Sequence, residues 1–179
     1  MINSKGKYSW IKLTVTITAA ILLIILYSVI FVFSAQSGEQ STQTSMSFSE
    51  RAVEFLNTLS GGRWSRQLIE ELVLYFENPI RKLAHFTEYT CMGILVYLIW
   101  RPWMQRGKKL YLLILVWVFV SGALDELHQL FVPDRWCSFV DVCLDTCGGA
   151  FVLLVCVMAS KMWIWNLYKK ATRKCKEIK

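Results

Sequence analysis

Four long runs of apolar residues limit what this 179-residue chain can fold into. The first, residues 13–33, contains no charged side chain and as a helix would be about 30 Å long, enough to cross a bilayer. The other three runs cover residues 80–100, 110–131 and 139–160. The sequence therefore predicts an all-α, polytopic membrane protein with four transmembrane helices in a single domain.

The composition agrees with this interpretation. Hydrophobic residues make up 55% of the chain and the mean hydropathy is +0.40, which is too apolar for an ordinary soluble domain. A cleaved signal peptide is the competing interpretation of the first run, with residues 32–34 as a weak cleavage site. The apolar region is longer than the roughly 7–15 residues usual in signal peptides, so we interpret it as an uncleaved span.

Lysine and arginine gather in three segments that flank the apolar runs: residues 1–12, 101–109 and 161–179. These segments hold 14 of the 20 basic residues but only one of the 13 acidic residues. Such clusters mark the cytoplasmic side of a membrane, so both termini are expected in the cytoplasm and residues 34–78 outside it. Because the net charge of +7 comes from membrane-flanking segments, nucleic acid is not expected as a partner.

The extracytoplasmic segment 34–78 is predicted to form two short amphipathic helices. Residues 47–50, Ser-Phe-Ser-Glu, have the form of a capping box, and the Gly-Gly pair 61–62 would end the helix that follows. Ser65 would begin the second helix, and the Asn-Pro pair 78–79 would begin the second span. These short helices would lie on the membrane, cover the mouth of the bundle or form a small docking surface.

The six cysteines form no C-x-x-C motif, so neither a zinc ribbon nor a disulfide framework is expected. Four of them lie inside apolar runs, where cysteine usually serves as a small buried residue. Cys137 falls in the short predicted outer loop between the third and fourth spans.

Ionisable and amide side chains gather at the predicted outer ends of spans two, three and four. Charged groups at that depth are costly and persist mainly where they are paired or functional. The candidate site consists of Arg81, Lys82, His85, Glu88, Asp125, Glu126, His128, Gln129, Arg135, Asp141 and Asp145. Both histidines of the chain belong to this set, which favours a functional pocket.

Helical spacing groups the members on spans two and three. His85 and Glu88 are three residues apart and share one face of the second span. Asp125, His128 and Gln129 are expected to share one face of the third span. All five side chains are therefore expected to face a common pocket.

On the fourth span, Asp141 and Asp145 are four residues apart and share a face. Two carboxylates this close to hydrocarbon need a cation, an arginine or a shared proton, and the basic residues of the set are the candidate partners. Gly148 continues the same face and Gly149 lies beside it. Small residues there are expected to let a neighbouring helix approach closely.

Three alternatives to a binding pocket stay open at this point. The charged groups could form an internal network that locks the helices together. They could ligate a divalent metal, but no H-E-x-x-H or comparable signature is present, so no residue is assigned as a metal ligand and no cofactor is identified. A histidine–carboxylate pair could transfer protons. A serine hydrolase is not expected, because Ser138 lacks a nucleophile-elbow context.

Three linked motifs resemble the VanZ-like family of small bacterial membrane proteins. They are R-K-L-A-H-F-T-E-Y at residues 81–89, D-E-L-H-Q-L-F followed by P-x-R within residues 125–135, and S-F-V-D-V leading to D-x-x-G within residues 138–148. The S-x-Q-S segment at residues 34–37 fits more loosely. Asp134 departs from the pattern, because the family often has glycine between the proline and the arginine.

The resemblance implies a multi-pass protein of the bacterial cytoplasmic (inner) membrane. The founding member of the family is associated with resistance to the glycopeptide antibiotic teicoplanin. An outward-facing polar cluster in such a protein is compatible with a site for an envelope lipid, a peptidoglycan precursor or the antibiotic itself.

Two functions follow as hypotheses. The first is an enzyme that acts on a lipid-linked envelope substrate. Its acid, base or ligand groups would be His85, Glu88, Asp125, Glu126 and His128. Its substrate-binding groups would be Arg81, Lys82, Gln129, Arg135, Asp141 and Asp145. The second is a non-catalytic protein that modulates access of an antibiotic or partner to the membrane surface. A proton-coupled carrier fits less well, because the inner halves of the spans hold almost no ionisable residues.

Overall fold

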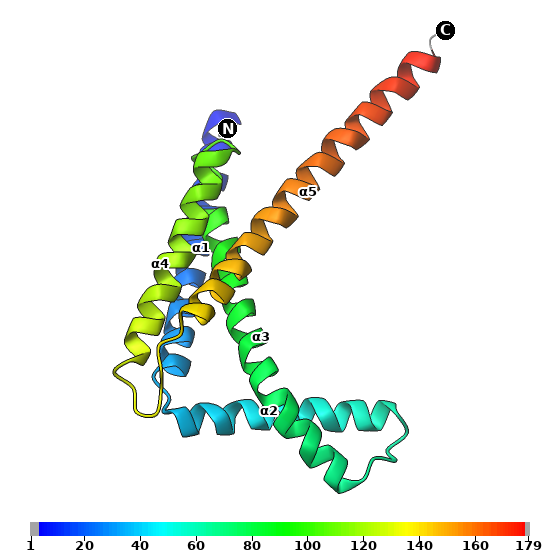
Figure 1. Ribbon diagram of the computed structural model, residues 1–179. Coiled ribbons are helices and arrows are strands. Elements are labelled where there is room, and N and C mark those ends of the chain that lie inside the picture. The colour runs from blue at the N-terminus through cyan, green and yellow to red at the C-terminus, as the bar shows by residue number, and fades with distance from the viewer. Residues whose placement is uncertain (1–3, 178–179) are drawn as a thin grey trace.

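The computed structural model describes residues 4–177, and it describes side chains for residues 9–159. Over that range the chain forms five helices in the order α1 (Ser4–Ser34), α2 (Gly38–Leu59), α3 (Arg66–Trp100), α4 (Lys108–Gln129) and α5 (Phe139–Glu177) (Figure 1). Residues 4–177 contain no strand, so the predicted all-α class is confirmed for them.

Four stretches are long and apolar enough to cross a membrane: Ser9–Ser34, Arg66–Trp100, Lys108–Gln129 and Phe139–Ala159. Large apolar side chains cover their outer surfaces, for example Ile24 on α1 and Leu112 on α4, each more than 60% exposed. Continuous exposed apolar surface of this kind marks contact with lipid. The four predicted spans are thus present as helices, with ends that differ from the predicted ones.

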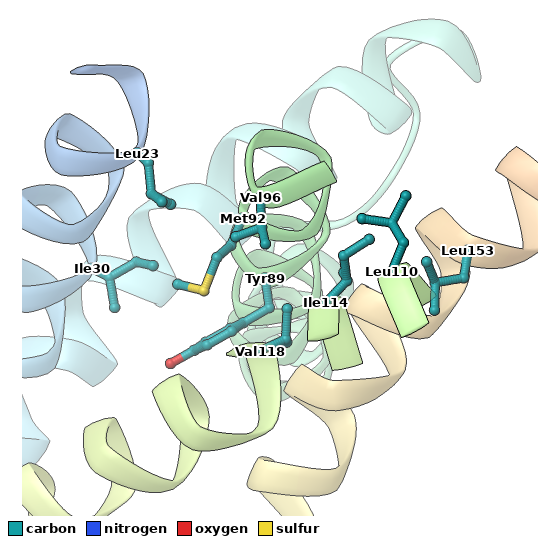
Figure 2. Close-up of a cluster of buried hydrophobic side chains, with 9 residues drawn as sticks. All are labelled: Leu23, Ile30, Tyr89, Met92, Val96, Leu110, Ile114, Val118 and Leu153. Atoms are coloured by element: carbon teal, nitrogen blue, oxygen red, sulfur yellow. The ribbon is translucent and has the colours of Figure 1, made fainter. Parts of the chain in front are cut away.

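Helix α3 lies at the centre and packs against each of the other four helices. The buried apolar side chains between α1, α3, α4 and α5 are Leu23, Ile30, Tyr89, Met92, Val96, Leu110, Ile114, Val118 and Leu153 (Figure 2). Glycines allow α5 to approach closely: a Cβ at Gly148 would lie 2.6 Å from the carbonyl oxygen of Phe86 on α3, and one at Gly149 would lie 2.9 Å from Val118 on α4. The close approach predicted for these glycines is confirmed.

The bundle has two distinct ends (Figure 1). At one end α1 begins and α5 ends, and the indole Nε1 of Trp103 in the α3–α4 turn donates to Oγ1 of Thr16, 2.8 Å away. At the other end lie α2 and the α4–α5 loop, which we call the α2 end. A chain that crosses a membrane four times requires the start of α1 and the end of α5 to lie at the same end, as they do here.

The second span does not begin at Pro79, which corrects the prediction. Helix α3 runs without a break from Arg66 to Trp100, and Pro79 lies inside it. Proline removes one helix hydrogen bond, but packing outweighs that local cost. Ser49 on α2 donates to the carbonyl of Val73, 2.8 Å away, and Arg81 pairs with Glu77 across the proline at 3.7 Å. The second short amphipathic helix is therefore the first part of α3, begun by Ser65 as predicted.

Helix α2 also begins earlier than predicted. Its capping box is formed by Ser37 and Gln40, each side chain bonding the other residue's backbone N–H, so the helix starts at Gly38 rather than near Ser47. It ends at Leu59, before Gly61 and Gly62, which both have positive φ angles as the Gly-Gly break predicts.

Helix α5 continues to Glu177, past the predicted end of the fourth span near residue 160. The basic side chains of residues 161–179, those of Lys5 and Lys7, and Cys175 lie outside the described side chains.

Candidate functional site

A cavity of about 380 Å³ lies at the α2 end, between α3, the α4–α5 loop and the start of α5. Seven of the predicted site residues line it: Arg81, Lys82, His85, Glu126, Gln129, Arg135 and Asp141. We call it the polar cavity. Thr42 of α2 and Asn78 of α3 also line it, and the sequence analysis assigned neither of them to the site.

The guanidinium of Arg135 forms three hydrogen bonds that link the elements around the polar cavity. Its Nε donates to the carbonyl of Gln36, its Nη2 to the carbonyl of Phe33 and its Nη1 to Oε1 of Gln129, each at 3.2 Å. Gln129 in turn donates to Oδ2 of Asp125 at 3.1 Å. One guanidinium thus joins the end of α1 to the end of α4.

Among the described side chains, no carboxylate is bonded directly to Arg135, because all three of its acceptors are neutral oxygens. Burial lowers the pKa of Arg135 and the like charge of Arg81 lowers it further, while the carboxylates of Asp125 and Glu126 act in the opposite direction. The group still stays protonated, since arginine does not lose its proton in proteins. Two guanidinium groups that repel each other in one wall form a site that an anion would stabilise.

Glu126 ties α4 to α5. Its Oε2 accepts a hydrogen bond of 2.7 Å from the backbone N–H of Ser138. The Ser138 hydroxyl then accepts from the N–H of Asp141 at 3.3 Å and so caps the start of α5. Glu126 is almost fully buried, so much of its bonding capacity is used in the loop.

Two ion pairs border the polar cavity. Lys82 Nζ lies 3.3 Å from Oδ1 of Asp141, and Arg81 Nη1 lies 3.7 Å from Oε1 of Glu77. Glu77 also accepts from the hydroxyl of Ser45 on α2. Lys82 is thus the cation that Asp141 was expected to need.

A second cavity of about 220 Å³ adjoins the first, and we call it the apolar cavity. Its wall is formed by the end of α1, by α2 and by α3: Phe33, Gln36, Ser41, Thr44, Ser45, Phe48, Ile80, Arg81, Ala84, His85, Glu88 and Arg135. Three of these residues, Arg81, His85 and Arg135, also line the polar cavity. Glu88 lines the apolar cavity but not the polar cavity.

Asp125 and His128 line a third cavity of about 440 Å³, between α1, α3 and α4. We call it the lateral cavity. The His128 ring stacks on Phe31 of α1, with ring centres 5.1 Å apart. The expectation that His128 and Gln129 share a face is therefore wrong: neighbours on a helix point in different directions, and Gln129 faces the polar cavity.

Asp145 lines none of these three cavities. It is 1% exposed and packs beside Gly122 of α4, and neither carboxylate oxygen has a hydrogen-bond partner among the described residues. Tyr89 lies next to the same glycine, and it too is fully buried with an unpartnered hydroxyl.

The α2 side of the polar cavity is lined by Gly38, the first residue of α2, and by Asp134 of the α4–α5 loop, neither of which the sequence analysis assigned to the site. The N–H of Gly38 donates to the carbonyl of Pro133 at 3.1 Å, and a Cβ at Gly38 would collide with the carbonyl of Asp134. Asp134 has a φ of 58°. This left-handed conformation favours glycine, which gives a physical reason for the glycine common at this position in the family that the motifs resemble.

No set of three or more His, Cys, Asp or Glu side chains within residues 9–159 is placed to hold a metal ion. The groups that surround the polar cavity are instead suited to hydrogen bonding and to charge pairing.

No curated protein and no solved structure was found to match the chain. A family model described as VanZ/LLP1 matches residues 19–161, which include every candidate site residue and all three cavities. The four apolar helices of the chain fit a multi-pass membrane protein of this type. The chain belongs to the VanZ/LLP1 family.

Proposed function

We propose that this protein binds an anionic lipid of the bacterial cell envelope at the outer face of the cytoplasmic membrane, with the polar and apolar cavities forming one site. The observation that carries the proposal is their shared wall. Arg81, His85 and Arg135 line both cavities. A ligand bound at this wall would therefore contact cations in the polar cavity and an apolar surface in the apolar cavity.

The headgroup would lie in the polar cavity. Guanidinium groups bind phosphate through paired hydrogen bonds. Arg135 uses three of its five N–H donors on the protein, which leaves two for a ligand. Arg81 has only a loose pair with Glu77, so its guanidinium is also available. A phosphate between them would remove the repulsion between their charges.

The chain of the lipid would lie in the apolar cavity. Phe33 and Phe48 in its wall are 40% and 53% exposed, and Phe33 belongs to a helix that is apolar enough to span the membrane. An acyl or prenyl chain can thus pass from the cavity into the bilayer without crossing water. A lipid-linked peptidoglycan precursor, with phosphate and a long apolar chain, meets both requirements.

Binding is favoured over catalysis by the positions of the proposed acid and base groups. His85 and Glu126 line the polar cavity, but Asp125 and His128 line the lateral cavity. The five candidate catalytic groups therefore do not surround one ligand. Of this set, His85 is the group at the shared wall, where it can donate to a headgroup.

A binding titration in nanodiscs tests the proposal, with a polyprenyl phosphate as the probe. Arg81→Gln is expected to weaken binding at least tenfold, because it removes a charged hydrogen bond to the phosphate. Arg66→Gln is the matched control: it also removes one positive charge and one i,i+4 ion pair from α3, at a site that is 92% exposed. Equal affinity of the two variants would refute this site.

A contribution to teicoplanin-type resistance is a further part of the proposal, which rests on the family. Binding of a peptidoglycan precursor at the membrane would change the access of a glycopeptide to its target. Expression of the wild type is expected to raise the teicoplanin concentration that inhibits growth, and His85→Ala or Arg81→Gln to abolish the effect while the protein still accumulates.

The second candidate function is a non-catalytic cover on the membrane surface, and one observation favours it. Helix α2 buries the serine-rich stripe Ser41, Ser45 and Ser49 against the protein, while Phe55 and Leu59 are more than 60% exposed. An apolar face turned outward suits a helix that lies in the interface. Loss of resistance on replacing Phe55 and Leu59 by serine, with full resistance in Arg81→Gln, would favour this function.

A further inference from the structure

The lateral cavity is separate from the proposed headgroup site and lies between two membrane-spanning helices. Helices α1 and α4 pack much less closely with each other than either packs with α3. The cavity of about 440 Å³ lies between them, with Ile30 and Phe31 on one side and Leu124 on the other. The walls of the lateral cavity are mostly apolar, so we expect a lipid from the bilayer to occupy it.

Side-chain contacts between α1 and α4 lie at both ends of this cavity. At the end farther from the α2 end, the hydroxyls of Tyr27 and Ser121 are 2.6 Å apart, and Nε1 of Trp117 donates to Tyr27 at 3.0 Å. At the other end His128 stacks on Phe31. The lateral cavity lies between these two contacts and opens toward the outer surface of the bundle, where Phe31 and Leu124 are both largely exposed.

Tyr89 forms the back wall of the lateral cavity. Figure 2 shows its ring extending from α3 between Ile30 and Val118, with the hydroxyl pointing away from Leu153. Tyr89 is 0% exposed and its hydroxyl has no hydrogen-bond partner within residues 9–159. A buried hydroxyl without a partner is costly, and more so where no water is available.

Two further side chains in the wall, His128 and Asp125, have atoms free to form a hydrogen bond with a ligand. Nε2 of His128 is buried and unpartnered among the described side chains. Asp125 uses Oδ2 to accept from Gln129, and it lines the same cavity as Tyr89. The wall thus offers a hydroxyl donor and a carboxylate acceptor. A ligand hydroxyl satisfies both at once, since it accepts one hydrogen bond and donates another.

We propose that the lateral cavity binds a lipid alcohol, a long apolar chain ending in a hydroxyl, with that hydroxyl placed between Tyr89 and Asp125. The chain lies along Ile30, Phe31 and Leu124 and leaves the protein between α1 and α4. Asp125 lies about one helical turn inside the end of α4, a depth of roughly 6 Å, which suits a hydroxyl carried just below the headgroups.

The test compares two probes in nanodiscs: hexadecanol and its methyl ether, which has the same chain but cannot donate a hydrogen bond. Hexadecanol is expected to raise the unfolding temperature of the wild-type protein more than the ether does. Tyr89→Phe is expected to bind hexadecanol about three- to tenfold more weakly, the effect of one neutral hydrogen bond. Diacylglycerol, tested in parallel, shows whether a one-chain or a two-chain alcohol is preferred.

Tyr97→Phe is the control, because it makes the same change on α3 outside the cavity, and it is expected to bind as the wild type does. Without a lipid alcohol, Tyr89→Phe should be at least as stable as the wild type, since it removes an unpartnered hydroxyl. A less stable Tyr89→Phe would mean that the hydroxyl has a partner inside the protein, and the proposal would fail. Equal binding of alcohol and ether by the wild type would also overturn it, and that comparison needs no variant.

Discussion

The Glu126 carboxylate at the end of α4 accepts a hydrogen bond of 2.7 Å from the backbone N–H of Ser138, the residue that caps α5. This bond spans the α4–α5 loop, which also carries Arg135. The position of Arg135 in the shared wall therefore depends partly on Glu126, a carboxylate that itself lines the polar cavity.

Glu126→Ala should leave the Ser138 N–H without its partner and destabilise the protein by about 1–3 kcal/mol. Glu126→Gln should cost less, because the amide oxygen still accepts and the loss of a negative charge relieves repulsion from Asp125 and Asp141. Thermal unfolding of both variants in detergent measures the difference. Equal losses would show that the hydrogen bond to Ser138 does not stabilise the loop.

Asp134→Gly should leave the protein as stable as the wild type or up to about 1 kcal/mol more stable, because glycine adopts a φ of 58° without strain. Asp134→Val should lose about 1–2 kcal/mol, since a β-branched residue strongly disfavours this conformation. The same unfolding measurement checks both. A stable valine variant would mean that the loop does not hold Asp134 in this conformation.

Gly148→Ala should destabilise the packing of α5 on α3 by about 1–3 kcal/mol, because its Cβ would lie 2.6 Å from the Phe86 carbonyl, a backbone atom with little room to shift. Gly107→Ala is the control, since its Cβ would meet no atom within 4 Å. The ratio of folded to aggregated protein after heating compares the two. Similar behaviour of both variants would contradict the close contact between α3 and α5.

The predicted topology can be tested with cysteine labelling. In a variant that keeps only Cys137, which is exposed in the α4–α5 loop, a membrane-impermeant maleimide should label intact spheroplasts. A single cysteine at the α3–α4 turn, introduced as Arg106→Cys, should react only after the membrane is opened. The reverse pattern would place the polar cavity in the cytoplasm and would contradict an outward-facing site.

The sequence predicted the four apolar helices well because hydrocarbon imposes a strong, local requirement: a long apolar stretch that crosses it must satisfy its backbone hydrogen bonds as a helix. It failed at Pro79, where the local signal for a helix start was opposed by contacts from α2, such as the bond from Ser49 to Val73. Such contacts join residues far apart in the chain, and no local pattern contains them.

Part of the site was predicted for the same kind of reason. Arg81 and Asp141 line one cavity because the predicted outer ends of their spans lie at the same end of the bundle. The separation of His128 from His85 depends on which face of α4 packs toward α1, and the apolar cavity depends on where α2 lies. Tyr89 had a signal in the sequence, as the last residue of the R-K-L-A-H-F-T-E-Y motif, but its unpartnered hydroxyl is visible only in the structure.

Native mass spectrometry of the protein released from a mixture of anionic and zwitterionic lipids tests the shared-wall site most directly. The wild type and Arg66→Gln should each retain an anionic lipid in preference to a zwitterionic one, and Arg81→Gln should lose that preference. Retention of the anionic lipid by Arg81→Gln at the wild-type level would contradict a headgroup site between Arg81 and Arg135.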